Sequence, residues 1–170
     1  MANLVGIKKI FVAEASSSDA TQMPAYGTSY SDLGDVYQET ASLKDDDPTV
    51  TEHKSETSSK KIILSEQGST NITLSLMDPN LELLASYFGG TISGSSGLRK
   101  WTRPRQLPSK NWAVRILAAE GLTVQCPCVK ITPKFDITYS SKGIMLVPMT
   151  IQCQEQLTFD ESDADPTVSL

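Results

Sequence analysis

Hydrophobic and polar residues alternate along much of this chain with a period of two, which is the pattern of a β-strand with one buried face. In the clearest run, residues 70–77, the apolar residues Ile72, Leu74 and Leu76 are separated by single polar ones. We therefore expect a mostly β, antiparallel fold with one wet face. The strands predicted in this way are 70–77, 124–132, 134–139 and 144–154, and a turn sequence at 140–143 joins the last two.

The alternation changes phase once, after Cys128. Cys126 and Cys128 share one face of the expected strand, whereas Val129 continues the pattern out of step. We expect a β-bulge there, and because Pro127 cannot donate to a sheet ladder, we expect this strand to lie near a sheet edge. The odd number of cysteines, three, argues against a disulfide framework. It favours buried free thiols over a zinc site shared with the distant His53.

One segment, residues 78–88, has the signature of an α-helix. Asp78 is a suitable N-cap, Pro79 suits the first helical position, and Gly89 and Gly90 end the helix. Apolar residues with helical spacing form a stripe along it, which indicates core packing against the sheet instead of a binding surface. The residues of this stripe are Leu81, Leu84, Ala85 and Phe88.

Long polar segments interrupt the predicted strands. We expect one β domain, residues 1–157, with polar loops at 15–34, 43–60 and 92–110. The acidic segment 158–170 is expected to be a tail that stays flexible until a partner orders it.

The segment 43–60 has the pattern of a hairpin with no apolar side. Between Thr49 and Thr57 its residues alternate without an apolar face. Such a hairpin cannot supply half of a hydrophobic core, so it must protrude, line water or meet another subunit. The three consecutive aspartates at 45–47 lack the spacing of a calcium loop and indicate a solvated turn.

The formal net charge of −5 is unevenly distributed. Residues 99–110 hold five of the fifteen basic residues and no acidic one, so the rest of the chain is strongly acidic and unsuited to tight nucleic-acid binding. Trp101 among these cations is compatible with a stacking site for nucleic acid, but we favour contact between this basic loop and the acidic loops of a neighbouring subunit. The candidate inter-subunit residues are Asp45, Asp46, Asp47, Arg99, Lys100, Trp101, Arg103 and Arg105.

The residues that catalysis would need are scarce. His53 is the only histidine, it lies in the polar hairpin, and no Gly-x-Ser-x-Gly elbow accompanies it. The glycine-rich run 89–97 follows a helix, so it does not match a phosphate-binding loop. We expect no enzymatic activity, no cofactor and no metal. The first residues lack the order of a secretory signal and no apolar run is long enough for a membrane span, so we expect folding in the cytosol and no membrane partner.

The order of these features resembles that of the tail tube (major tail) proteins of long-tailed bacteriophages. The resemblance covers residues 5–157 as an order of elements and does not depend on one diagnostic motif. It is carried by the following segments: an opening strand Gly-Ile-Lys-Lys-Ile-Phe-Val-Ala (6–13), the hairpin sequence 47–57, the strand, capped helix and Gly-Gly-Thr over 70–91, a strand at 112–119, the run 130–143 and Val-Pro-Met-Thr (147–150).

The resemblance implies an antiparallel β-sandwich or barrel with one flanking α-helix, six copies of which form a ring, and rings that stack into a tube. The tube would hold a tape-measure protein, later let DNA pass without specific binding, and contact terminator and baseplate or hub proteins. The chain would then be a virion tail protein that is assembled in the host cytoplasm. Glu52 and Glu56, expected on one side of one strand, are candidate lumen or ring-stacking residues, with ordinary solvated positions as an equal alternative.

Two other functions stay open at this point. One is a different tail component of the same fold, such as a terminator or a baseplate ring protein. The other is a carbohydrate-binding β-sandwich in which Trp101 and Trp112 stack on sugar, although aromatic residues make up only 6% of the chain.

Overall fold

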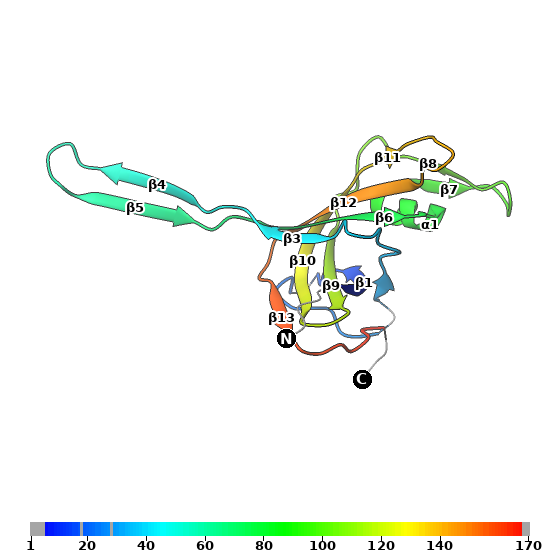
Figure 1. Cartoon of the computed structure of the whole chain (residues 1–170), viewed down its shortest axis with the longest axis horizontal. Coiled ribbons are helices and arrows are strands. Elements are labelled where there is room, and N and C mark those ends of the chain that lie inside the picture. The colour runs from blue at the N-terminus through cyan, green and yellow to red at the C-terminus, as the bar shows by residue number, and fades with distance from the viewer. Residues whose placement is uncertain (1–5, 18, 28, 168–170) are drawn as a thin grey trace.

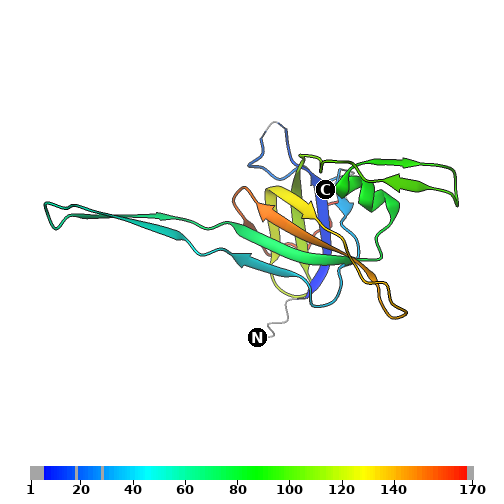
Figure 2. The ribbon, with the colours of Figure 1, turned by 90° about the horizontal axis from the view of Figure 1, so that it is seen from above.

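The computed structural model describes residues 6–17, 19–27 and 29–167, which form a β-rich body with a long two-stranded arm (Figures 1 and 2). The elements of this part of the chain are β1 (Ile7–Glu14), β2 (Ser31–Asp32), β3 (Ser42–Asp45), β4 (Thr49–Lys54), β5 (Lys61–Glu66), β6 (Thr70–Met77), α1 (Leu81–Phe88), β7 (Thr91–Ser93), β8 (Lys100–Thr102), β9 (Asn111–Ala118), β10 (Thr123–Pro133), β11 (Asp136–Ile137), β12 (Met145–Cys153) and β13 (Thr158–Asp160).

Nine of the strands form one antiparallel sheet. Its order is β2-β1-β9-β10-β12-β6-β3, with β13 added to β10 and β11 added to β12. The other four strands form two separate hairpins, β4–β5 and β7–β8. The predicted class, a mostly antiparallel β fold with one flanking helix and long polar loops, is confirmed.

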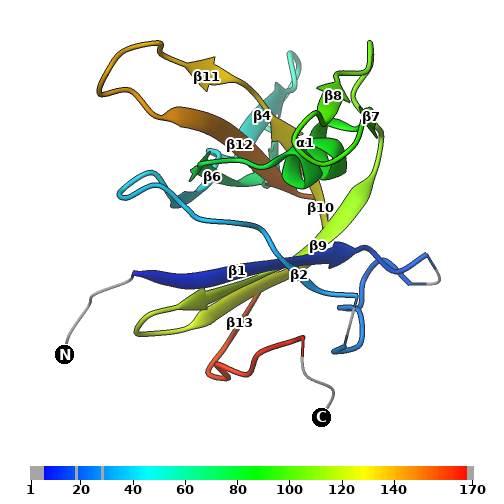
Figure 3. The ribbon, with the colours of Figure 1, turned by 90° about the vertical axis from the view of Figure 1, so that its right-hand side faces the viewer.

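One stretch of chain, residues 31–45, connects the two ends of this sheet. The N–H of Leu33 donates to the carbonyl of Ile10 on β1 at 2.8 Å, and the carbonyl of Asp35 then accepts from Met77 on β6 at 2.9 Å. The chain continues into β3, which pairs with β6. The sheet therefore curls over on itself, and Figure 3 shows the two resulting layers, with β6 and β12 facing β1 and β9.

The hydrophobic core lies between these layers and follows the predicted alternation. Ile72, Leu74 and Leu76 of β6 are all buried, and the register places each beside a buried residue of β12. Each such side chain contributes about 1.5–3 kcal/mol through removal of apolar surface from water. The cross-strand pairs are Ile72–Ile151, Leu74–Met149 and Leu76–Val147.

The long strand β10 changes partners at the predicted bulge. Its register with β9 shifts between Cys126 and Val129, which confirms the bulge beside Pro127. Before the bulge, Thr123–Gln125 pairs with β13, and after it Val129–Pro133 pairs with β12. The strand is therefore interior and the predicted edge position is wrong. Pro127 lies where the second partner changes, so its missing N–H interrupts neither ladder.

Helix α1 begins after Asn80, and the prediction that Asp78 caps it is wrong. The Asn80 side chain accepts a hydrogen bond from the N–H of Leu83 at 2.7 Å, which is the N-cap interaction. Asp78 instead has φ +49°, so it turns the chain out of β6 before the helix starts. The helix ends at Gly89, which has φ +74°, as predicted.

The helix packs its buried face across the open side of the curled sheet. Leu84, Tyr87 and Phe88 are its buried residues. The Phe88 ring stacks on Phe135 with 4.5 Å between centroids, and Tyr87 lies beside Trp112. The predicted stripe did not include Tyr87, and burial raises the pKa of this tyrosine.

The C-terminal segment is folded onto the body, so the prediction of a separate flexible tail is wrong for residues 158–167. Strand β13 pairs with β10, and the side chain of Arg115 on β9 contacts the same segment. Its Nη1 lies 3.1 Å from Asp160 Oδ2, and its Nη2 donates to the carbonyl of Ser162 at 2.9 Å. A fully buried guanidinium needs such partners, and the acidic segment supplies two of them. Residues 168–170 lie outside the described part.

The loop predicted at 15–34 covers the neighbouring part of the same outer face. It contains the short strand β2, and Tyr30 is buried in a small second cluster with Phe11 and Leu117. The Tyr30 hydroxyl donates to the carbonyl of Pro24 at 2.8 Å. No helix in the described residues is long and apolar enough to cross a membrane.

Candidate assembly surface

The most unusual feature of the molecule is the arm formed by β4 and β5. Every residue from 43 to 67 is exposed, and the two strands pair with each other and with no further strand of the described chain. Figures 1 and 2 show that the arm extends far beyond the body. A two-stranded hairpin of this kind is only marginally stable in water, so the arm is suited to being covered by a partner.

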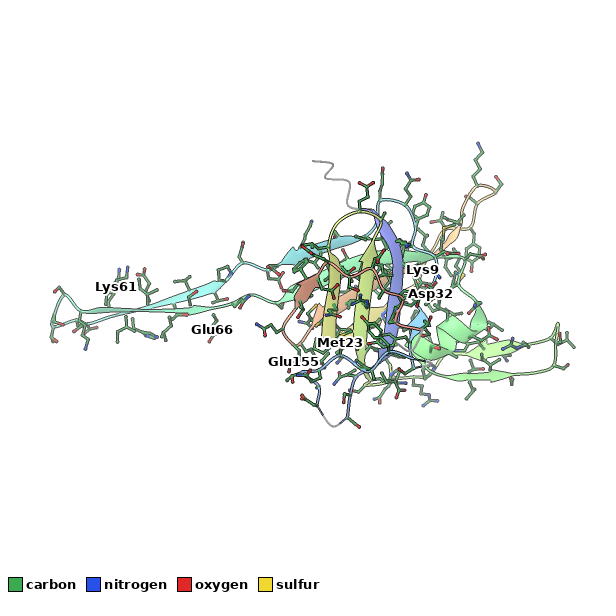
Figure 4. All side chains as sticks on the ribbon, turned by 90° about the horizontal axis from the view of Figure 1, so that it is seen from below. Lys9, Met23, Asp32, Lys61, Glu66 and Glu155 are labelled. Carbon is green, nitrogen blue, oxygen red and sulfur yellow. The ribbon has the colours of Figure 1, made fainter. Side chains whose placement is uncertain are left out.

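The arm carries apolar side chains on both of its faces. The register places Leu64 opposite Thr51 and Ile62 opposite His53 on one face, whereas Ile63 lies opposite Glu52 on the other. The exposed fractions of Ile62, Ile63 and Leu64 are 50%, 56% and 53%. Figure 4, in which Lys61 and Glu66 mark the two ends of β5, shows side chains standing out on either side of the ribbon.

The prediction of a wholly polar hairpin at 43–60 is therefore wrong in extent and in character. The hairpin protrudes, as expected, but it runs from Thr49 to Glu66, and its return strand is the apolar run after Lys61. The Ile-Ile-Leu sequence at 62–64 was the signal that the sequence interpretation missed. Three consecutive apolar residues show neither strand nor helix periodicity, so pattern alone did not place them.

The arm is fixed to the body at its root by two of the candidate aspartates. Asp46 Oδ2 accepts from Ser69 Oγ at 2.6 Å and from Asn71 Nδ2 at 3.0 Å. Asp45 Oδ1 accepts from Thr70 Oγ1 at 2.5 Å. These hydrogen bonds join the chain that enters the arm to the chain that returns from it.

Gly68 allows the two chains at the root to come close together. A Cβ added at Gly68 would lie 2.0 Å from the carbonyl oxygen of Asp46, which no side chain tolerates. Asp47, the third candidate aspartate, is exposed.

The two candidate lumen residues do not lie on one strand. Glu52 is on β4 and its carboxylate is paired with Lys61 at 2.6 Å and with Lys54 at 3.8 Å. Strand β4 ends at Lys54, so Glu56 lies in the loop at the tip of the arm. The expectation that the two carboxylates face the same way along a strand is therefore wrong, because the chain turns before Glu56.

The loop predicted at 92–110 contains a second hairpin. Strand β7 pairs with β8, so Lys100 and Trp101 belong to a strand. Trp101 is half-buried, packs against Phe88 and Phe135, and its Nε1 donates to the carbonyl of Gly89 at 2.9 Å. This tryptophan thus tethers the hairpin to the end of the helix.

Most of the basic side chains in 99–110 are engaged within the molecule. Arg99 forms an ion pair with Glu82 at 2.5 Å, which lowers the pKa of that carboxyl. Arg103 lies 5.4 Å from the ring centroids of Phe88 and Phe135, and Lys110 pairs with Glu14. Arg105 is exposed, and no salt bridge among the described residues includes it.

The tryptophans do not form the platform that a sugar would stack on. Trp101 faces the core-side aromatic residues, and Trp112 is half-buried between Tyr87 and the Lys110 ammonium, which lies 4.5 Å from its ring centroid. The carbohydrate-binding alternative therefore loses the residues on which it was based.

The cysteines form a buried thiol cluster beside β12. Cys126 and Cys128 are buried and Cys153 is half-buried, all as free thiols. The interaction between the Cys126 and Cys153 thiols lowers the pKa of Cys126 and raises that of Cys153. His53 is far away on the exposed arm, and the described residues contain no group of three or more His, Cys, Asp or Glu side chains that could hold a metal ion.

A groove of about 620 Å³ lies at the root of the arm. One wall is formed by β3 and the start of β6, with Leu43 and Asp45, and the other by the connection from β12 to β13, with Glu155. Figure 4 shows Glu155 on the side of the body from which the arm leaves. No basic residue is among those that line the groove.

No protein-family model matches the chain, and no curated protein matches it in sequence. Among solved structures, a chain of the sheath–tube complex of the PVC extracellular contractile injection system in its extended state is 12% identical, with 94% of this chain and 93% of that chain covered and a TM-score of 0.44.

Two further solved chains are similar at the same level. A chain of the PVC sheath/tube terminator in its extended state is 12% identical, with 94% and 99% covered and a TM-score of 0.40. A chain of the anti-feeding prophage cap, which terminates its tube, is 11% identical, with 95% and 94% covered and a TM-score of 0.41. What this chain does has to be inferred from its own surfaces.

Proposed function

We propose that this chain is a non-enzymatic structural subunit of a phage-like tail, and that its copies assemble through the β4–β5 arm. The observation that carries the proposal is the arm itself, in which all residues from 43 to 67 are exposed and apolar side chains occupy both faces. Exposed apolar residues on a free hairpin favour aggregation unless a partner covers them. A second copy of the chain is a partner that is always present.

The order of sequence elements shared with tail tube proteins gives this assembly its form. Six copies form a ring, rings stack into the tail tube, and the tube encloses the tape-measure protein and later conducts DNA during ejection. The net charge of −5 keeps attraction to phosphate weak. Terminator and baseplate or hub proteins contact the ends of the tube, and the complete particle is a virion tail that is assembled in the host cytoplasm.

The test is self-association measured by sedimentation velocity over a range of concentrations. The double variant Ile62→Thr, Leu64→Thr keeps strand propensity but removes apolar surface from one face of the arm, and we expect association to weaken at least about tenfold. Because both side chains are exposed, the free energy of unfolding of the monomer should change by less than about 0.5 kcal/mol. Leu122→Thr, at an equally exposed leucine on the body, is the matched control and should associate normally.

A larger change tests the same proposal without relying on single side chains. Residues 48–66 are replaced by Asn-Gly, a two-residue hairpin turn. This short turn can connect Asp47 to Gln67, because the neighbouring residues Asp46 and Ser69 are hydrogen-bonded to each other at the root of the arm. The armless protein should fold as a monomer and fail to assemble. If it assembles as the full chain does, the arm is not the assembly element and the proposal is wrong.

The alternative of a terminator or baseplate ring protein predicts a different end point. Such a protein would form rings through the same arm and would not stack into tubes of variable length. The size distribution of the assembled full chain therefore separates the two possibilities.

A further inference from the structure

Two surfaces on opposite sides of the body carry opposite charges, and each also exposes apolar side chains. The first is the groove at the root of the arm. Its carboxylates are those of Asp45 and Glu155, and Leu43 and Phe159 in its lining are 38% and 53% exposed. With no basic residue in its lining, the groove suits a short segment that presents one cation and one apolar side chain.

The second surface is the segment 103–110, Arg-Pro-Arg-Gln-Leu-Pro-Ser-Lys, which contains no acidic residue. Its two prolines are seated against the glycines at the end of α1. A Cβ on Gly89 would lie 3.1 Å from Cδ of Pro108, and one on Gly90 would lie 3.0 Å from Cδ of Pro104. The backbone is therefore held at two points that are four residues apart, and the residues between them are exposed.

The residues between these prolines are Arg105, Gln106 and Leu107. Arg103 and Lys110, at the two ends of the segment, already contact aromatic rings and Glu14. Arg105 is thus the cation that this segment offers to a partner, and Leu107, which is 44% exposed, is the apolar residue two positions away.

Figure 1 shows β3 and β13, which flank the groove, on the side of the body from which the arm leaves, and α1 and β8 on the far side. A contact between two such different surfaces is head-to-tail, and repetition of it gives a ring or a filament. We propose that Arg105 and Leu107 of one copy occupy the arm-root groove of the next. Arg105 then lies against Asp45 and Glu155, and Leu107 against Leu43 and Phe159.

This contact rests on the proposed function, because it needs copies that assemble. The test is a charge-reversal cycle in the full chain, read by sedimentation velocity. Arg105→Glu and Glu155→Lys each place like charges in the contact, and each should weaken association at least about tenfold. The double variant restores opposite charges with their positions exchanged, and it should associate within about threefold of the unmodified chain.

Lys142→Glu is the matched control, since this exposed lysine lies in the β11–β12 turn outside both surfaces, and it should associate normally. Circular dichroism of each variant at low concentration should show the unmodified fold. The contact is overturned if either single variant associates normally, or if the double variant is as weak as the two single effects combined. If the contact is overturned but assembly still depends on the arm, the proposed function stands. If the unmodified chain never associates, both the contact and the proposed function are overturned.

Discussion

Arg115 is the charged residue for which loss of the ionic partner should lower the free energy of unfolding most. Its side chain is 0% exposed, on the outer face of β9, and it reaches three groups: Gln125 Oε1 at 3.0 Å, Asp160 Oδ2 at 3.1 Å and the carbonyl of Ser162 at 2.9 Å. The Tyr26 ring centroid lies 5.4 Å from its guanidinium carbon. Among the described residues, Asp160 is the one ionic partner of this buried cation.

We expect Asp160→Ala to lower the free energy of unfolding by about 2–4 kcal/mol. Removal of one partner from a buried ion pair typically costs about 3–5 kcal/mol, because the other charge stays buried and uncompensated. The lower figure follows from the position of Asp160, whose side chain is 28% exposed and leaves water a route to the guanidinium. The two neutral acceptors that remain also reduce the loss.

The assay is urea unfolding at a protein concentration at which the chain is monomeric, so that association does not add to stability. A loss of this size moves the unfolding midpoint by about 1–2 M urea. Lys9→Gln is the control, because Lys9 and Asp32 form an exposed pair at 3.5 Å that should contribute less than about 1 kcal/mol. A loss below about 0.5 kcal/mol for Asp160→Ala would refute the view that this pair holds the C-terminal segment on the body.

Three smaller predictions concern individual residues. Asn80→Ala removes the N-cap of α1 and should lower thermal stability by about 1 kcal/mol, whereas Asp78→Gly, at a residue with φ +49°, should leave stability unchanged or slightly higher. Gly68→Ala should destabilise the arm root by about 1–3 kcal/mol in the same melting experiment, since its Cβ meets the Asp46 backbone. Burial raises the pKa of Tyr30 to about 12 from 10.0, so the folded state holds this proton more tightly than the unfolded chain. The contribution of Tyr30 to the free energy of unfolding is therefore fully present below pH 10 and is lost as the pH rises from 10 towards 12. Tyr30→Phe should make the urea midpoint fall less steeply over this pH range.

The strands in which apolar and polar residues alternate regularly were predictable from the sequence. The strands that carry Ile72, Leu74 and Leu76 and their partners on β12 were placed correctly, because apolar residues that alternate with a period of two indicate a β-strand with one buried face. The bulge beside Pro127 was also predictable, since a change of phase needs an extra residue. The edge position was not, because it depends on which strands pair with β10 at each end, and that is set by the whole sheet.

The candidate surface was predictable only as a region. The lack of an apolar face over 49–57 predicted a hairpin near 43–60 that protrudes, lines water or meets another subunit. Its apolar return strand, Lys61–Glu66, lies outside the predicted range. The basic segment was found by charge, yet the sequence could not show that Arg99, Arg103 and Lys110 are used within the molecule. The acidic segment after 157 contacts Arg115, which is distant in sequence and whose burial no local sequence pattern predicts.

The central claim is that copies of this chain build a tail tube through the arm, and negative-stain electron microscopy of the purified chain tests it most directly. We expect hollow tubes of stacked rings with six subunits each for the full chain, and dispersed single particles when Asn-Gly replaces residues 48–66. A full chain that stays a dispersed monomer at high concentration, or an armless chain that still forms tubes, would contradict it.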